Sequence, residues 1–268
     1  MPPTPPPPAP GPGLGDALRF AFGTLTVLPV TVRRWDRQTA RGGMLCSPVA
    51  GLVVGLAAGG LGALLLVLGG GPLLAAVATA AVPAVLTRGL HLDGLADTAD
   101  GLGSAKPADE ALRIMKRSDI GPFGVVTLLF ALLAQVAALA ERFAQGWAHG
   151  LFAAAVAAVA ARCALTLASR TGVPAARPEG LGAAVAGTVP RGLAVLAGAV
   201  VVAGCAAVGG AFGPYEALRA GLAAVLALGV AELLLRHCRR RFGGVTGDVF
   251  GALAESAGLT AVVVLALG

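Results

Sequence analysis

The sequence predicts an all-α integral membrane protein, a polytopic bundle of about seven transmembrane helices preceded by an N-terminal interfacial or re-entrant helix. Of its 268 residues, 56% are hydrophobic and only 13% are charged, whereas a soluble domain carries roughly 25% charged residues. Apolar runs of nearly the length that crosses a bilayer recur along the chain. Ala, Gly, Val and Leu dominate these runs and only 4% of residues are aromatic, which favours closely packed helices.

The apolar runs define the expected elements in order. Residues 1–13 are Pro-rich and predict a disordered leader, which precedes a single membrane-embedded domain over residues 14–268. Residues 14–30 are apolar but short for a span, and they carry Asp16 and Arg19, so they predict the interfacial or re-entrant helix. The seven expected spans are 45–68, 72–87, 122–140, 150–168, 192–212, 219–235 and 248–267.

The basic residues predict the orientation of this bundle. Sixteen Lys and Arg residues fall in loops on one side of the membrane, and only Arg142 and Arg219 fall on the other. Because positive loops stay on the cytoplasmic side, the first set is expected to face the cytoplasm. The net charge of +6 is therefore explained by topology, and we expect no nucleic-acid partner. The four cysteines stand singly, which argues against a zinc site or a disulfide framework.

The longest of these loops carries an acidic motif, RGLHLDGLADTADGLG at residues 88–103. Asp93, Asp97 and Asp100 are spaced i, i+4, i+7, so a helix would place all three on one face, about 5–6 Å apart between neighbours. Carboxylates this close repel one another unless a cation lies between them, and a hard divalent ion prefers oxygen ligands. The motif therefore predicts a metal site, and the alternative is a helix start with Asp93 as its N-cap.

A second motif, RIMKRSDIGPFG at residues 113–124, runs into the third expected span. Lys116 and Arg117, together with a helix N-terminus, would form a phosphate cradle. Ser118 or Asp119 would cap that helix. The same residues would equally serve as a topology anchor beside the membrane, and the spacing leaves these two interpretations open.

The last expected span contains ionisable residues that are costly in lipid. Asp248 and Glu255 lie on one face of it, and Glu255 is about 10 Å deep at 1.5 Å per residue. Arg162, inside the fourth expected span, is predicted at a similar depth. Such residues mark a functional cavity, where an Arg would hold a phosphate, or they form a buried ion pair. His91, within the acidic motif, is a candidate ligand or proton acceptor.

Three strings together resemble the adenosylcobinamide-GDP ribazoletransferase family, also called cobalamin 5'-phosphate synthase. They are GLHLDGLADTADGLG at 89–103, ALRIMKRSDIGPFG at 111–124 and GGVTGDVFGALAE at 243–255. FGTLTVLPV at 22–30 and SPVAGLVVG at 47–55 extend the resemblance over nearly the whole chain after the leader. One departure is the order of the charges of Arg117 and Asp119, which is the reverse of the family pattern. It leaves open which of the two contacts a metal or a phosphate.

The resemblance implies a magnesium-dependent transferase of substituted phosphate groups in the bacterial cytoplasmic (inner) membrane, acting in the last steps of cobalamin (vitamin B12) biosynthesis. Its substrates would be adenosylcobinamide-GDP and alpha-ribazole 5'-phosphate or alpha-ribazole, and its products adenosylcobalamin (5'-phosphate) and GMP. The expected Mg2+ ligands are Asp93, Asp97, Asp100 and Asp248. The expected proton acceptor is one of the Asp residues or His91. The expected substrate-binding residues are Lys116, Arg117, Asp119, Arg162 and Glu255.

Two other functions fit parts of the sequence. A CDP-alcohol phosphotransferase also places spaced Asp-Gly pairs at the cytoplasmic end of a helix, but the second run of aspartates that follows in that family is missing here. A secondary transporter would use intramembrane Asp, Glu and Arg as a coupling path and would contain inverted repeats, whereas the acidic motif occurs once. Membrane lipid is an expected partner, and the sequence leaves open whether the chain forms a homo-oligomer.

Overall fold

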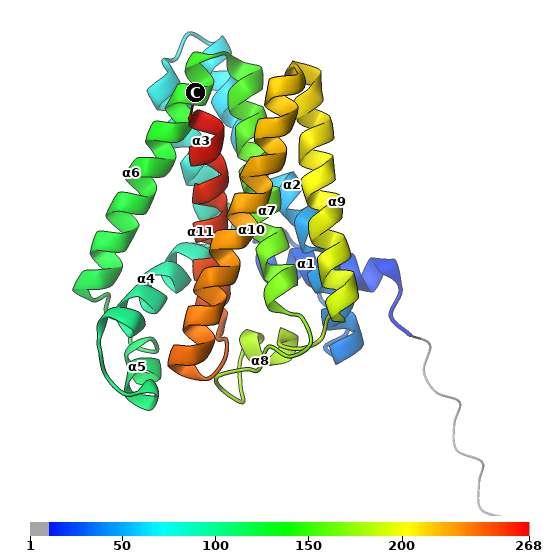
Figure 1. Cartoon of the computed structure of the whole chain (residues 1–268), viewed down its shortest axis with the longest axis vertical. Coiled ribbons are helices and arrows are strands. Elements are labelled where there is room, and N and C mark those ends of the chain that lie inside the picture. Colours follow the sequence, from blue (N-terminus) through cyan, green and yellow to red (C-terminus); the bar gives the residue numbers. More distant parts are fainter. Residues whose placement is uncertain (1–10, 268) are drawn as a thin grey trace, which may run out of the picture.

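The structure, a computed structural model, describes residues 11–267, and every regular element in that part of the chain is helical (Figure 1). In chain order the elements are α1 (Leu14–Leu25), α2 (Arg37–Val67), α3 (Pro72–Leu86), α4 (Leu90–Gly103), α5 (Ala108–Ile114), α6 (Pro122–Ala144), α7 (Trp147–Ala168), α8 (Leu181–Val185), α9 (Arg191–Gly209), the 3-10 turn η1 (Gly210–Phe212), α10 (Pro214–Phe242) and α11 (Gly247–Ala266). The predicted all-α class is confirmed.

Six of the described helices are long and apolar enough to cross a membrane, namely α2, α6, α7, α9 continued by η1, α10 and α11. The remaining predicted span, 72–87, forms α3, which has 15 residues. It is only about 22 Å long at 1.5 Å per residue, and the hydrocarbon core is about 30 Å thick. Together α3 and α4 qualify as one broken span with an 88° bend. The chain is therefore a multi-pass membrane protein with six or seven spans.

The centre of the bundle is α7, which is covered by α2, α10 and α11 (Figure 1). Its contact with α2 uses a stripe of glycines spaced four residues apart. A Cβ added to Gly55 would lie 2.8 Å from Ala158 Cβ, and one added to Gly59 would lie 2.8 Å from Leu151 Cα. Small residues at this spacing let two membrane helices pack backbone against backbone, as the composition predicted.

The N-terminal helix covers Leu14–Leu25, five residues less than the predicted 14–30, and packs one face on α2 through Ala17, Phe20 and Ala21. Its interfacial or re-entrant position stays a prediction. Beyond it, Asp36 caps α2 by accepting a hydrogen bond from the backbone N–H of Thr39 at 2.8 Å. That bond lowers the pKa of Asp36 below its usual value. Residues 1–10 lie outside the described part of the chain, so the predicted leader over 1–13 stays a prediction.

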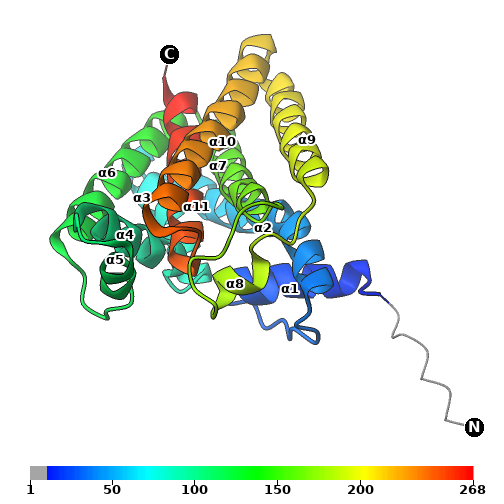
Figure 2. The ribbon, with the colours of Figure 1, turned by 60° about the horizontal axis from the view of Figure 1, so that its bottom comes forward.

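Four helices gather at one end of the bundle: α1, α4, α5 and α8 (Figure 2). The short helices α5 and α8 were not predicted, because 7 and 5 residues show too little periodicity to stand out from a loop. The 16 Lys and Arg residues expected on the cytoplasmic side lie in the loops and helix ends of this end of the bundle.

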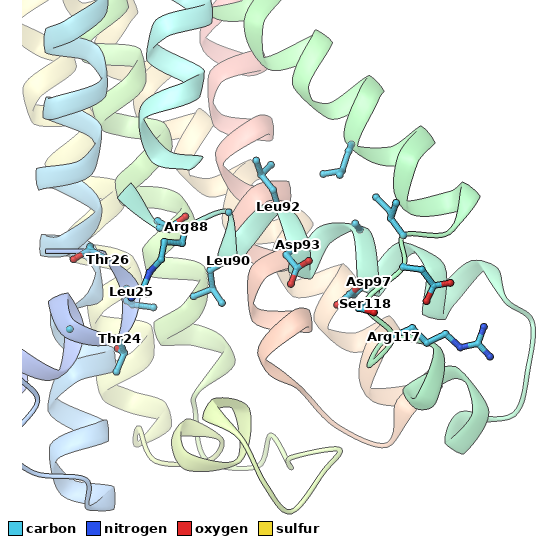
Figure 3. A pocket seen from close by; sticks show the side chains of 17 residues that line it. Thr24, Leu25, Thr26, Arg88, Leu90, Leu92, Asp93, Asp97, Arg117 and Ser118 are labelled. Carbon is cyan, nitrogen blue, oxygen red and sulfur yellow. The ribbon is translucent and has the colours of Figure 1, made fainter. Parts of the chain in front are cut away.

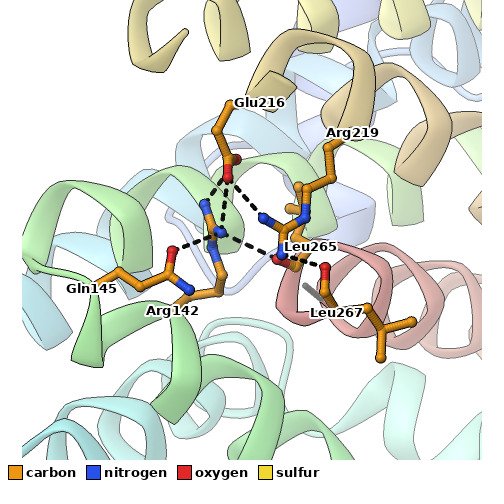
Figure 4. Close-up of polar contacts among 6 residues, drawn as sticks. All are labelled: Arg142, Gln145, Glu216, Arg219, Leu265 and Leu267. Carbon is orange, nitrogen blue, oxygen red and sulfur yellow. Dashed lines mark hydrogen bonds and ion pairs between the residues drawn. The ribbon is translucent and has the colours of Figure 1, made fainter. Parts of the chain in front are cut away.

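A buried ionic cluster lies at the opposite end, formed by Arg142 of α6, Glu216 and Arg219 of α10, and the last carbonyls of α11 (Figure 4). Arg142 Nη2 donates to Glu216 Oε2 at 2.9 Å, and Arg219 Nη1 donates to Glu216 Oε1 at 2.9 Å. Arg142 also donates to the carbonyl of Leu265 at 3.1 Å. The two arginines that the sequence placed in loops on this side are therefore buried, and they join three helix ends.

We expect the substitution Arg142→Met to lower the free energy of unfolding by about 3–5 kcal/mol, because it removes one partner of a buried ion pair. The matched control is Arg236→Met. Its pair with Glu232, at 2.8 Å, has an arginine side chain that is 63% exposed, against 0% for Arg142. The control should cost about 0–1 kcal/mol. Equal losses, measured by denaturant unfolding in detergent, would contradict the assigned role of burial.

Candidate functional site

The acidic motif folds as α4, whose axis is bent by 88° from that of the preceding helix α3. The bend lies at two consecutive residues in the left-handed region, Arg88 at φ 54° and Gly89 at φ 70°. Helix α4 then begins at Leu90 with Gly89 as its N-cap. Asp93 is thus in the first turn and is not the N-cap, which removes the simplest structural explanation of the motif.

A close crossing of α4 and α11 brings Asp248 of α11 to the acidic residues of α4. A Cβ on Gly94 would lie 2.6 Å from the carbonyl oxygen of Asp248 and 2.9 Å from its Cα. A Cβ on Gly251 would lie 3.0 Å from the carbonyl oxygen of His91. The two backbones touch because neither glycine carries a side chain. Asp248, far away in the sequence, thereby joins the acidic residues of α4.

A cavity of about 760 Å³ opens beside α4 (Figure 3). Asp93 and Asp97 line it, together with the end of α1, the α3–α4 bend and the loop before α6. Its wall consists of residues 23–26, 87–90, 92, 93, 96, 97, 117–120 and 128. The volume is within the range of about 300–1,000 Å³ that is typical of pockets for cofactor-sized ligands.

The acidic face of this site, which we define as Asp93, Asp97 and Asp248, is electrostatically strained. Burial, together with repulsion from the nearby carboxylates of Asp93 and Asp248, raises the pKa of Asp97 to about 7. Arg177 opposes this repulsion, since its Nη1 lies 3.5 Å from Asp248 Oδ2. Sequence reasoning missed Arg177, which lies in the loop between α7 and α8 and shows no motif of its own.

Asp100 has a different position from the other two carboxylates of the motif. Its Oδ2 accepts a hydrogen bond from the backbone N–H of Gly121 at 2.7 Å, and its Oδ1 accepts one from Gly124 at 2.9 Å. Both groups belong to the first turn of α6, so Asp100 satisfies backbone donors that the helix itself cannot pair. The sequence indicated a common face for the three acids, but it could not show that another helix end covers one of them.

The predicted basic and buried residues divide into two groups. Arg117 and Asp119 line the cavity, whereas Lys116 pairs with Glu179 at 3.1 Å on the exposed surface. Arg162 and Glu255 lie apart from the cavity and line a separate crevice of about 50 Å³ among α2, α3, α6, α7 and α11. His91 is only 3% exposed and does not line the cavity. The structure therefore does not bring Lys116, Arg162, Glu255 and His91 to the cavity.

The donor set of the acidic face suits a hard cation, because it consists of carboxylate oxygens alone. Within residues 11–267, however, no group of three or more Asp, Glu, His or Cys side chains is gathered closely enough to hold a metal ion. Magnesium is commonly bound by only one or two carboxylates, with substrate phosphates and water completing the shell. The residues present therefore fit an ion that is shared with a phosphate ligand.

A family model described as Cobalamin-5-phosphate synthase matches residues 17–266, almost the whole described chain. The chain belongs to this family. Proteins named adenosylcobinamide-GDP ribazoletransferase are similar to it. The relative from Frankia casuarinae is 44% identical over 93% of this chain and 94% of its own length. The relatives from Nocardioides sp. and Bradyrhizobium diazoefficiens are 41% and 38% identical, over 90% and 93% of this chain and 94% and 92% of theirs. No solved structure matches.

The α4–α11 contact of this family member can be tested with Gly94→Ala. The added methyl group would meet the backbone of Asp248, so we expect the free energy of unfolding to fall by about 1–3 kcal/mol. Gly60→Ala is the control, because nothing lies within 4 Å of the Cβ position of Gly60 in α2. It should cause no loss. Thermal unfolding in detergent measures both, and an unchanged Gly94→Ala variant would show that the helices do not touch there.

The different positions of Asp97 and Asp100 predict opposite effects on stability. Asp97→Asn removes a carboxylate that is repelled by its neighbours, so at pH 8 without added metal we expect stability to rise. Asp100→Asn replaces an oxygen that accepts a backbone N–H by an amide, so we expect a loss of about 1–2 kcal/mol. Denaturant unfolding of both variants checks this contrast. A loss in both would contradict the electrostatic strain that we assign to Asp97.

Proposed function

We propose that this protein is an adenosylcobinamide-GDP ribazoletransferase. It would transfer the cobinamide phosphate of adenosylcobinamide-GDP to alpha-ribazole 5'-phosphate or alpha-ribazole, giving adenosylcobalamin 5'-phosphate or adenosylcobalamin and GMP. The names of the relatives support this reaction. The observation that carries it is the cavity of about 760 Å³ lined by Asp93 and Asp97, because displacement at a diphosphate requires neutralised charge and aligned oxygens.

In this reaction the ribose hydroxyl of the acceptor attacks the phosphorus on the cobinamide side of the diphosphate. The new P–O bond forms as the bond to the GMP phosphate breaks, and GMP leaves with the electron pair. Asp93 or Asp97 accepts the proton of the hydroxyl, since both reach the cavity. The buried position of His91 favours a supporting role beneath α4 for that residue.

We propose Mg2+ as the cofactor, with Asp93 and Asp97 as its protein ligands and Asp248 beside them. A bound Mg2+ would neutralise the diphosphate and orient its oxygens. Arg177 keeps Asp248 in place through its 3.5 Å contact and donates a second bond to the carbonyl of Leu112. Arg117 and Asp119 border the cavity from the loop before α6, where they can contact the substrate.

The site is proposed to face the cytoplasm of a bacterium from its cytoplasmic membrane. Its nucleotide substrates are water-soluble, and the cavity lies at the end of the bundle that carries the basic loops. Membrane lipid would contact the apolar side chains that the long helices expose, among them Leu129, Phe130 and Leu133 of α6. The family assignment disfavours both a CDP-alcohol phosphotransferase and a secondary transporter.

The test is turnover of the purified protein in detergent, with no gradient present. With magnesium, adenosylcobinamide-GDP and alpha-ribazole 5'-phosphate, we expect release of GMP. Asp93→Asn and Asp97→Asn should each reduce GMP release by about 100-fold or more, because each removes a group that contacts the reacting phosphates.

Asp109→Asn is the matched control, because Asp109 lies on the exposed surface of α5 and does not line the cavity. It should release GMP at the wild-type rate. Full activity of both the Asp93 and the Asp97 variants would overturn the assigned site, and release of CMP from a CDP-linked lipid would overturn the assigned reaction.

A further inference from the structure

Arg88 has a backbone conformation that an arginine rarely adopts. Its φ is 54°, and Ala105 is the only other non-glycine residue with positive φ in residues 11–267. The left-handed region is unfavourable for residues with a Cβ and is open to glycine. A bend formed only for structural reasons would be better served by glycine, as at Gly89 directly after it. An arginine at this position therefore indicates a role for its side chain, since backbone strain of this kind concentrates at functional positions.

Arg88 lines the cavity and is exposed. Figure 3 shows the side chain extending from the bend toward Leu25 and Thr26 at the end of α1. In the described part of the chain it forms no side-chain hydrogen bond and no ion pair, not even with Asp93. An exposed arginine that borders the cavity and has no side-chain partner is available to a ligand there.

The charges around the cavity indicate which ligand. Asp93 and Asp97 lie between Arg88 on one side and Arg117 on the other (Figure 3). Lys116 is paired with Glu179 on the surface, and Arg162 lies in the separate crevice. An anionic ligand that enters beside two carboxylates requires cations, and the planar fork of a guanidinium matches two phosphate oxygens.

We propose that Arg88 is a phosphate-binding residue of this cavity. The inference rests on the proposed function, which supplies two phosphate-bearing substrates. Arg88 binds either the diphosphate of the nucleotide-activated donor or the 5'-phosphate of the acceptor. The strained backbone makes this contact possible, because the bend directs the side chain of residue 88 toward α1 at the edge of the acidic motif (Figure 3).

The test compares Arg88→Gly and Arg88→Gln with Arg240→Gln in the full-length protein. Arg240 is an exposed arginine in the last turn of α10 and does not line the cavity, so it controls for the loss of one positive charge. We expect Arg88→Gly to keep or raise the melting temperature, because glycine relieves the strained conformation. A purely structural Arg88 would instead give a lower melting temperature.

Substrate kinetics distinguish the two phosphate sources. If Arg88 binds the donor, both Arg88 variants raise the KM for adenosylcobinamide-GDP by about tenfold or more with either acceptor. If it binds the acceptor, they raise the KM for alpha-ribazole 5'-phosphate and leave that for alpha-ribazole unchanged. Either result supports the proposal. Unchanged KM values for all three substrates in the Arg88 variants, or the same increase in Arg240→Gln, would overturn it.

Direct binding separates this proposal from the proposed function. Calorimetry with inorganic pyrophosphate and with alpha-ribazole 5'-phosphate needs no turnover. At least one probe should bind about tenfold more weakly to Arg88→Gly than to the wild type. A wild-type protein that binds a probe through Arg88 but releases no GMP would contradict only the reaction. Equal affinities for both probes would contradict the role of Arg88 even in an active enzyme.

Discussion

The site depends on direct backbone contact between α4 and α11. Asp93 and Asp97 belong to a helix that lies across the end of the bundle, whereas Asp248 begins a helix that runs through it. They meet because Gly94 and Gly251 leave no side chains between the two helices. Carboxylates held this close repel one another, so the free energy that places them comes from the packing of α11 against α7 and α10. The stable part of the bundle thereby holds an unstable arrangement of charge.

The sequence predicted the bundle well, because a helix that crosses the bilayer core must be a long run of apolar residues. Each apolar run between 122 and 267 became a helix, with ends displaced by only a few residues where the run contained no charge. Among these runs, 219–235 differs most from its helix, since α10 extends over Pro214–Phe242. The first predicted span, 45–68, also begins eight residues after the start of α2 at Arg37. The buried Glu216 and Arg219 of α10 resemble loop residues in the sequence, and they are tolerated in the helix because Glu216 accepts hydrogen bonds from both Arg142 and Arg219.

The residues of the site were predicted less completely than the helices. Helical spacing correctly indicated that Asp93 and Asp97 share a face, and both line the cavity. It also indicated Asp100, which instead caps α6, because spacing describes one helix and not the neighbour that packs on it. Helical spacing could not indicate Arg177 or Arg88 either, because Arg177 lies in the α7–α8 loop and Arg88 lies in the α3–α4 bend. Depth along a span suggested that Arg162 reaches the substrate, but Arg162 lines a separate crevice among α2, α3, α6, α7 and α11.

The glycine stripe of α2 has a consequence for motion. Where backbones touch without intervening side chains, two helices interlock closely, so we expect α2 and α7 to move as one unit. The cavity, by contrast, is enclosed by α1, the α3–α4 bend and the loop before α6, all outside that unit. Any closure around a large corrinoid nucleotide would therefore occur in this rim, while the scaffold within the membrane keeps a fixed shape throughout the catalytic cycle.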